Sequence, residues 1–345
     1  MAGTPAQGEI NRRVLLVRRP TGIPQPDDFA FDEAPVPPLG DGQFLIRNLY
    51  LSVDPAQRGW AADAANYAKP VPLGSVMRAL AVGVVVESRH PRFPVGSHAY
   101  GWFDWQDFAV AEPSDVLTRF DEPEVALSAY AGVLGINGLT AWLAFHNLGR
   151  PARGDTVLVS TAAGAVGSIV GQLAQAAGCR VVGLTGGDDK AELCRSRFGY
   201  DVALNYKTGA IEALLADAAP DGLDIFFDNV GGAILDAGLR QMRVGGRVVQ
   251  CGTASIPSWS PPPEGLRNER EVLTRRLAWS GFVIFDHQPL FGETMGELVA
   301  MIRDGTLVYD EDLRRGIESA PEALTDVYSG RNRGKMLIDL GQSVA

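Results

Sequence analysis

The stretch Asp155–Gln172, DTVLVSTAAGAVGSIVGQ, changes its pattern at the residues that decide the fold. Its apolar run, Val157–Val159, predicts a buried strand, and the later apolar residues Ile169, Val170 and Leu173 have helical spacing. A turn of small residues separates the two, AAGAVG. In a doubly wound parallel sheet such a turn lets the backbone approach a pyrophosphate, which the N–H groups at the helix start can bind. The stretch therefore predicts a dinucleotide-binding domain.

The turn is an incomplete form of the GxGxxG fingerprint, because Ala162 stands where the first glycine is usual. The alternative is that Gly164 and Gly167 only let the helix pack closely on the strand. A strand before the turn, a helix after it and a second strand at the right distance favour the binding interpretation.

On either side of this stretch, the spacing of apolar and turn residues divides the chain into two regions. From about Leu127, short β-branched runs alternate with helical segments, which predicts a parallel sheet with right-handed crossovers. The first 125 or so residues instead alternate with period two between Pro and Gly turns, which predicts a compact β domain. The tail Gly334–Leu340 alternates in the same way and is expected to return to that domain. We expect a β domain over residues 1–126, completed by 310–345, and a dinucleotide-binding domain over 127–309.

The second strand of the parallel sheet indicates which dinucleotide binds. An NAD-binding fold carries Asp or Glu about 20 residues after the glycines, for the ribose 2′-hydroxyl. Here the strand Arg180–Thr185 ends in Gly186 and Gly187, and we place Asp188 and Asp189 at the next helix start. Lys190 then offers an ammonium for a 2′-phosphate, a contact worth roughly 1.5–3 kcal/mol, or about 10- to 150-fold for NADP over NAD. A solvated surface lysine is the alternative, and an Asp188 that faced the ribose would reverse the preference.

Composition and charge exclude several classes of protein. The 31 basic and 41 acidic residues give a net charge of −10, without a basic run suited to nucleic acid. No stretch approaches about 18 uninterrupted apolar residues, so no membrane partner is expected. Three cysteines without CxxC spacing indicate neither disulfides nor a zinc finger, and four scattered histidines predict no protein-bound metal. With no leader evident in the first residues, we expect a cytoplasmic protein.

Several motifs resemble one known family in their order along the chain. STAAGAVGSIVGQ, GGDDK, LNYKT, DNVGG, QCGTAS and NRGK, with LSVDPAQRG near the start, resemble the zinc-free medium-chain dehydrogenase/reductases. The resemblance is to the branch of prostaglandin reductase (leukotriene B4 12-hydroxydehydrogenase) and curcumin or alkenal reductases. It covers nearly the whole chain and implies an α/β protein, with a GroES-like β-barrel catalytic domain, a Rossmann domain and NADPH as cofactor.

The resemblance also implies roles for individual residues. Gly164–Gly167 should lie along the pyrophosphate, Lys190 and Tyr206 should face the adenosine phosphate, and Asn332 should lie at the nicotinamide end. The complete set of cofactor-binding residues that we expect is Thr140, Ala163, Gly164, Ala165, Val166, Gly167, Gly186, Lys190, Tyr206, Asn229, Cys251, Gly252, Thr253, Ala254, Ser255, Phe282, Val283, Ile284 and Asn332.

Family members reduce the carbon–carbon double bond of α,β-unsaturated ketones and aldehydes, with hydride transfer to the β-carbon. The donor expected at the developing enolate is Tyr67, because a phenol stays protonated at neutral pH. The sequence departs from the family at Pro257, which stands where a second active-site tyrosine is usual. Aromatic residues expected around the cleft favour a bulky or aromatic substrate, namely Trp60, Tyr67, Trp102, Phe103, Trp105 and Trp259.

Other functions remain open on the sequence alone. The same scaffold supports quinone reduction, which needs no protonation at carbon. A nucleotide-binding sensor or structural protein with little catalysis is the alternative of another class, because a fold does not fix a function. Relatives are commonly homodimers, so we expect a homodimer that acts on a small-molecule enone.

Overall fold

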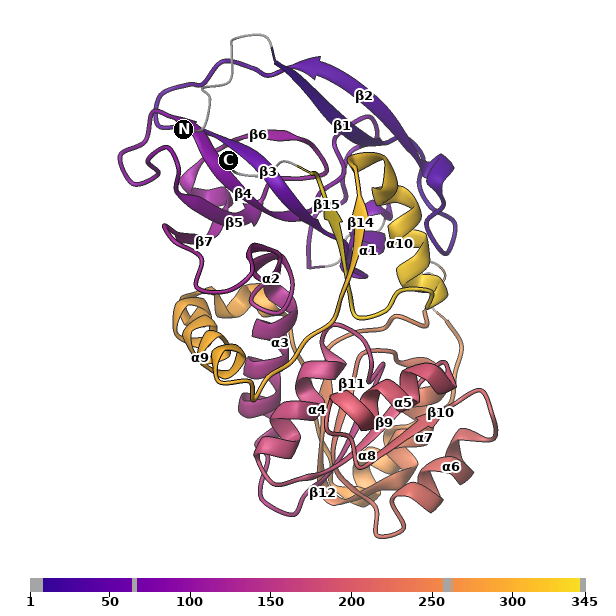
Figure 1. Ribbon diagram of the computed structural model, residues 1–345. Coiled ribbons are helices and arrows are strands. Elements are labelled where there is room, and N and C mark those ends of the chain that lie inside the picture. Colours follow the sequence, from indigo (N-terminus) through magenta and orange to yellow (C-terminus); the bar gives the residue numbers. More distant parts are fainter. Residues whose placement is uncertain (1–8, 64–66, 257–260, 262, 342–345) are drawn as a thin grey trace. The chain divides into compact units, whose positions relative to one another are not determined.

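The computed structural model describes residues 9–63, 67–256, 261 and 263–341, and it separates into two units. One unit comprises residues 1–135 and 311–345, and the other comprises residues 136–310 (Figure 1). The first unit extends past the expected residue 126 because α2 (Leu127–Ala131) packs on its sheet. Tyr130 of α2 stacks on Phe120, with ring centroids 4.0 Å apart.

The first unit is built on a seven-stranded sheet with the order β14-β15-β3-β4-β5-β7, in which β6 also pairs with β3. The strand β15 runs antiparallel to β3 and parallel to β14, so the C-terminal tail forms part of this sheet. A separate pair, β1 and β2, completes the strands. Their bounds are β1 Ile10–Leu16, β2 Phe29–Pro35, β3 Phe44–Ser52, β4 Leu80–Ser88, β5 His98–Trp102, β6 Phe108–Ala111, β7 Val116–Phe120, β14 Glu311–Arg315 and β15 Lys335–Asp339.

Short helices connect these strands, in keeping with the frequent Pro and Gly in this part of the sequence. Besides α2 they are α1 (Ala56–Ala61), α10 (Ala320–Ser329) and the 3₁₀ turns Pro26–Asp28, Pro113–Asp115 and Ile317–Ser319. Trp60, Phe103 and Trp105 are at most 1% exposed here, so these three of the aromatic residues expected around a cleft belong to the core.

The second unit is a six-stranded parallel sheet with the order β10-β9-β8-β11-β12-β13. The order reverses between β8 and β11, and ligands of such sheets bind at the carboxyl ends beside this switch point. Buried apolar side chains of these strands, such as Leu158, Val182 and Phe226, form one core cluster. The strands are β8 Thr156–Ser160, β9 Arg180–Thr185, β10 Val202–Asn205, β11 Leu223–Asp228, β12 Met242–Gln250 and β13 Ala278–Gly281.

Helices follow the strands as the alternating sequence pattern predicts. They are α3 Ile136–Ala144 with a π-helical turn at Phe145–Gly149, α4 Gly167–Ala176, α5 Asp188–Arg197, α6 Ile211–Ala218, α7 Gly232–Gln241, α8 Glu269–Arg275 and α9 Phe291–Arg303, with 3₁₀ geometry at Ile284–Leu290. None of the helices in the described ranges is long and apolar enough to cross a membrane.

Candidate functional site

The turn after β8 leaves backbone donors free where a pyrophosphate is expected. Thr161 has a positive φ of 54°, and the Gly164 N–H donates back to the Thr161 carbonyl at 2.8 Å. The helix α4 then begins at Gly167 without a side-chain cap. Within the described chain, the N–H groups of Ala165, Val166 and Gly167 have no hydrogen-bond acceptor. Unsatisfied N–H groups at a helix start fit an anionic ligand, so this turn suits a dinucleotide.

Close packing accounts for part of the glycine pattern as well. A Cβ on Gly167 would lie 3.0 Å from the Ala162 Cα and would collide with the Thr161 carbonyl. The Tyr200 hydroxyl also donates to the Gly167 carbonyl at 2.6 Å. The packing interpretation and the phosphate interpretation therefore both apply to the same turn.

A buried carboxylate joins the ends of three neighbouring strands beside this turn. Asp228, at the end of β11, accepts hydrogen bonds from Ser160 Oγ of β8 at 2.7 Å and from Gln250 Nε2 of β12 at 2.6 Å. It also accepts the N–H groups of Val230 and Gly231, at 3.0 and 2.8 Å. Burial raises the pKa of Asp228, and these hydrogen bonds oppose that rise. The sequence analysis missed this network, although a polar residue ending the buried run LDIFFD was a signal for it.

The network positions two of the predicted cofactor segments. Asn229 donates its side-chain amide to the Ser160 carbonyl at 3.0 Å, and its backbone N–H bonds Ser160 Oγ at 2.8 Å. The Cys251 N–H donates to the Asp228 carbonyl at 2.8 Å, and the Ser255 hydroxyl donates to the Val230 carbonyl at 2.8 Å. Asn229 and the segment Cys251–Ser255 are thus held together at the carboxyl ends of β11 and β12.

The thiol of Cys251 is not set up as a nucleophile in this site. Burial raises its pKa well above that of a free cysteine, and the charge of Asp228 adds to the rise. A protonated thiol is a poor nucleophile. Its place in the site is therefore structural, through its backbone.

The segment after β13 lies beside the same edge of the sheet. The Phe282 N–H donates to the Gln250 carbonyl at 3.0 Å, and the Phe282 ring stacks on His287 with centroids 4.7 Å apart. Val283 and Ile284 follow directly along the chain. Pro257 and Trp259, on which the expected departure from the family rests, lie outside the described residues.

The carboxyl end of β9 is free of the acidic residue that NAD would need. Asp188 and Asp189 lie in the first turn of α5, as the sequence predicts. Asp188 Oδ1 accepts a hydrogen bond from Asn205 Nδ2 at 3.0 Å. Lys190 follows in the same helical turn, and Tyr206 is fixed by its N–H, which donates to the Thr185 carbonyl at 3.1 Å. Gly186 thus follows the carboxyl end of β9, Lys190 lies in the helix after it, and Tyr206 follows the neighbouring strand β10.

Two of the predicted cofactor residues belong to other elements of the chain. Thr140 is part of α3 in the second unit. Asn332 belongs to the first unit, where its amide donates to the Gly334 carbonyl at 2.8 Å.

In the first unit, Asp54 belongs to a buried ion pair, and its charge also acts on Tyr67. Lys335 Nζ of β15 donates to Asp54 Oδ1 at 2.8 Å and to the Val53 carbonyl at 2.7 Å, and both side chains are buried. Burial lowers the pKa of Lys335, and Asp54 opposes this shift. The pair joins the SVDP and NRGK motifs of the sequence.

The Tyr67 side chain is 55% exposed, yet its hydroxyl lies near polar neighbours. Partial burial raises the pKa of Tyr67, Asp54 adds to the rise, and the nearby Trp60 side chain opposes it. Close by, the Arg58 guanidinium lies 4.4 Å from the centre of the Tyr328 ring, whose hydroxyl donates to the Pro55 carbonyl. The phenol of Tyr67 therefore stays protonated at neutral pH.

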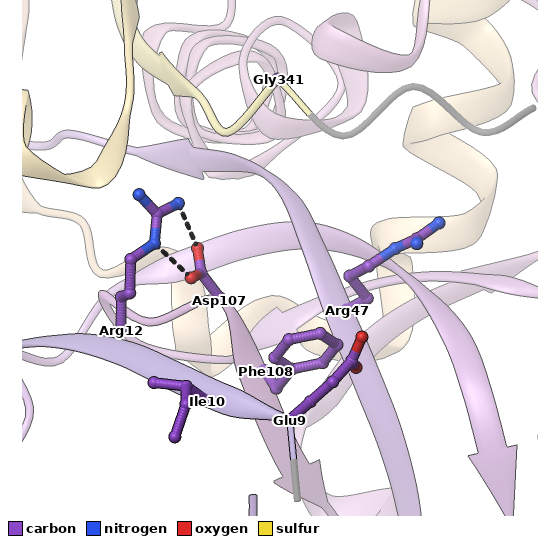
Figure 2. A pocket seen from close by; sticks show the side chains of 7 residues that line it. All are labelled: Glu9, Ile10, Arg12, Arg47, Asp107, Phe108 and Gly341. Carbon is purple, nitrogen blue, oxygen red and sulfur yellow. Dashed lines mark hydrogen bonds and ion pairs between the residues drawn. The ribbon is translucent and has the colours of Figure 1, made fainter. Parts of the chain in front are cut away.

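A separate hollow lies on the first unit (Figure 2), and its volume is about 630 Å³. Its most prominent feature is the ion pair in which Arg12 donates two hydrogen bonds to Asp107, at 2.7 and 3.2 Å. None of the predicted site residues lines it. The lining residues are Glu9, Ile10, Arg12, Arg47, Asp107, Phe108 and Gly341.

Known proteins resemble this chain over nearly its whole length. The family model described as "N-terminal domain of oxidoreductase" matches residues 12–118, and the one described as "Zinc-binding dehydrogenase" matches residues 165–301. The chain belongs to the medium-chain dehydrogenase/reductase family, in its zinc-independent branch. Despite the second description, no cluster of three His, Cys, Asp or Glu residues suited to a metal occurs in the described chain.

Two relatives and one solved structure are similar to this chain over nearly its whole length. The chain is 38% identical to 2-alkenal reductase (NADP(+)-dependent) of Nicotiana tabacum, over 96% of this chain and 98% of the relative. It is 36% identical to NADPH-dependent curcumin reductase of Escherichia coli, over 96% and 97%. Among solved structures, CurA from Vibrio vulnificus in complex with NADPH superposes with a TM-score of 0.90 at 34% identity, covering 96% of this chain and all of that one.

Proposed function

We propose that the protein is an NADPH-dependent reductase of the carbon–carbon double bond in α,β-unsaturated ketones and aldehydes. The observation that carries the proposal is the full-length similarity to 2-alkenal reductase (NADP(+)-dependent), supported by similarity to (+)-pulegone reductase of Mentha piperita, 35% identical over 95% of this chain. The free N–H groups after β8 and the acid-free end of β9 fit the cofactor.

Bound NADPH would supply the hydride that adds to the β-carbon of the substrate. The turn Ala163–Gly167 would hold the pyrophosphate, and Lys190 and Tyr206 would face the 2′-phosphate. Asn229, Cys251–Ser255 and Phe282–Ile284 would lie along the ribose and nicotinamide, with Thr140 and Asn332 completing the set. The network of Asp228 would keep two of these segments in register by hydrogen bonding to Ser160 and Gln250.

Tyr67 is our candidate for the group that stabilises the enolate and protonates the α-carbon. Its raised pKa supports this role, because a protonated phenol can donate to a developing negative charge. The variant Tyr67→Phe should lower kcat for enones by about 10- to 100-fold, with little change in the KM for NADPH. Steady-state kinetics with both substrates measures this. Unchanged kcat would assign proton delivery to solvent or another group.

The function is tested by following NADPH absorbance with an aryl enone, a para-quinone or no acceptor. Loss of absorbance with the enone, together with formation of the saturated ketone by mass spectrometry, is the expected result. Turnover of the quinone alone would assign quinone reduction to the protein. Binding of NADPH without turnover of either acceptor would favour a nucleotide-binding role.

The proposal extends to the oligomeric state and the cellular location of the protein. We propose a homodimer, formed through the exposed edge strand β13, and a cytoplasmic location. In the described sheet β13 pairs only with β12, and Trp279 on it is 41% exposed. An edge strand of this kind can pair with a second copy.

A further inference from the structure

Lys207 lies at the carboxyl end of β9, although it follows β10 in the chain. A Cβ added to Gly186 would lie 3.5 Å from both Lys207 Cε and Lys207 Nζ, and 3.3 Å from the Tyr206 hydroxyl. The two side chains therefore converge over Gly186, where a dinucleotide fold places the adenosine ribose. Lys190 lies in the first turn of α5, which follows Gly186 and Gly187 directly in the chain.

The backbone around Lys207 is fixed by hydrogen bonds, so its position is built into the fold. The Lys207 N–H donates to Asn205 Oδ1 at 3.1 Å, and the Thr208 hydroxyl donates to the Asn205 carbonyl at 2.8 Å. The N–H of the preceding Tyr206 is bonded to Thr185 of β9. Side-chain to backbone bonds of this kind define a tight turn. The turn anchors the lysine stem next to the neighbouring strand end.

The charge of Lys207 is available to a ligand. Its side chain is exposed, and no carboxylate in the described part of the chain forms an ion pair with its ammonium. The adjacent Asp188 carboxylate is hydrogen-bonded to Asn205 instead. The whole sequence holds only four lysines among 31 basic residues, and two of these four, Lys190 and Lys207, flank Gly186 and Gly187.

We propose that Lys207 is a second cationic ligand of the cofactor's 2′-phosphate, in addition to Lys190, and that it helps to set the preference for NADP over NAD. This inference rests on the proposed function, which requires NADPH. A phosphate ester carries up to two negative charges and three acceptor oxygens, so cations from two sides of it can each form a charge-assisted hydrogen bond. Lys207 would contribute to binding of the 2′-phosphate and not to binding of the rest of the nucleotide.

The test is titration calorimetry with two nucleotide probes, 2′,5′-ADP and 5′-AMP, which differ in the 2′-phosphate. The variant Lys207→Met should weaken binding of 2′,5′-ADP by about 5- to 20-fold and change binding of 5′-AMP less than about 2-fold. Lys207→Arg should restore most of the affinity. At higher salt concentration, the affinities of the wild-type protein and of Lys207→Met for 2′,5′-ADP should differ less, because ions screen an exposed charge.

A matched control removes an exposed cation elsewhere in the same unit. Arg270 of α8 is exposed, and α8 packs on β12, away from β9 in the sheet order. Arg270→Met should leave the affinity for 2′,5′-ADP unchanged. Equal affinity of Lys207→Met and the wild-type protein for 2′,5′-ADP, or an equal loss for both probes, would overturn the inference. A wild-type protein that does not prefer 2′,5′-ADP would instead overturn the proposed cofactor.

Discussion

Asp104 combines an uncommon backbone conformation with a raised side-chain pKa. It lies between β5 and β6 with a φ of +61°, a region that few residues other than Gly, Asn and Asp adopt. Its carboxylate accepts the Ala79 N–H at 3.3 Å. Burial raises the pKa of Asp104 to about 7, although the Ala79 hydrogen bond and Arg78 oppose the shift. The folded protein therefore holds a proton on Asp104 at a pH where the unfolded chain does not.

This titration predicts a pH-dependent stability. The pKa of Asp104 in the folded protein lies above the unfolded value of 3.8. The contribution of Asp104 to the free energy of unfolding is therefore most favourable below pH 4, and it is lost as the pH rises to about 7. A pKa shift of this size corresponds to at most about 4 kcal/mol in the free energy of unfolding, and the partial exposure of the Asp104 side chain reduces this value. Asp104→Asn keeps the hydrogen-bond acceptor without the charge, so it should stabilise the protein at pH 8 by about 1–3 kcal/mol.

Thermal unfolding of the wild-type protein and Asp104→Asn at pH 5 and pH 8 measures this effect. The gain in melting temperature should be clearly larger at pH 8 than at pH 5. The same gain at both values would mean that Asp104 does not titrate between them. A loss at both would mean that its charge is needed for folding.

At the scale of elements, glycines in α4 and β9 leave space for one aromatic side chain. A Cβ on Gly171 would lie 2.8 Å from the Tyr200 hydroxyl oxygen, and a Cβ on Gly183 would lie 2.8 Å from the same ring. Tyr200 is buried between them and donates to the Gly167 carbonyl at the start of α4. The helix that would bind the pyrophosphate is thus positioned by an aromatic contact outside the turn.

Gly171→Ala should therefore lower the free energy of unfolding by about 1–3 kcal/mol, because the methyl group overpacks this site. It should also raise the KM for NADPH through displacement of α4. Calorimetry and kinetics measure the two effects. The matched control is Gly296→Ala in α9, where an added Cβ meets nothing within 4 Å. That change should stabilise the helix by about 0.5–1 kcal/mol. Equal effects of the two substitutions would contradict the assigned contact.

At the scale of the whole molecule, the exposed edge strand β13 predicts self-association. Light scattering after gel filtration should give a mass of about 74 kDa, twice the 36.9 kDa of one chain. Trp279→Glu places a charge on this edge and should give the monomer. Phe31→Glu, at an aromatic residue of the first unit that is 59% exposed against 41% for Trp279, should remain dimeric. A wild-type monomer, or a dimer in both variants, would contradict pairing through β13.

Predictions from the sequence succeeded where the signal is local. The strand–turn–helix pattern around Val157–Gly167 and the alternation of the C-terminal tail predicted β8, α4 and β15. The first aspartates of α5 were placed correctly because helix starts favour them. Burial of Phe103 and Trp105 was harder to foresee, since an aromatic residue suits a core and a cleft equally well.

The sequence by itself determined the class of fold, the expected cofactor and the family, because periodicity, turn residues and motif order are properties of neighbouring residues. Only the tertiary structure decided which polar groups meet. Ser160 and Asp228 are 68 residues apart, and Asp54 and Lys335 are 281 apart, yet each pair forms a buried hydrogen bond. Lys207 reaches the end of β9 only because β10 pairs beside that strand. Such contacts depend on strand order and register, which bring distant residues together and leave no local pattern in the chain.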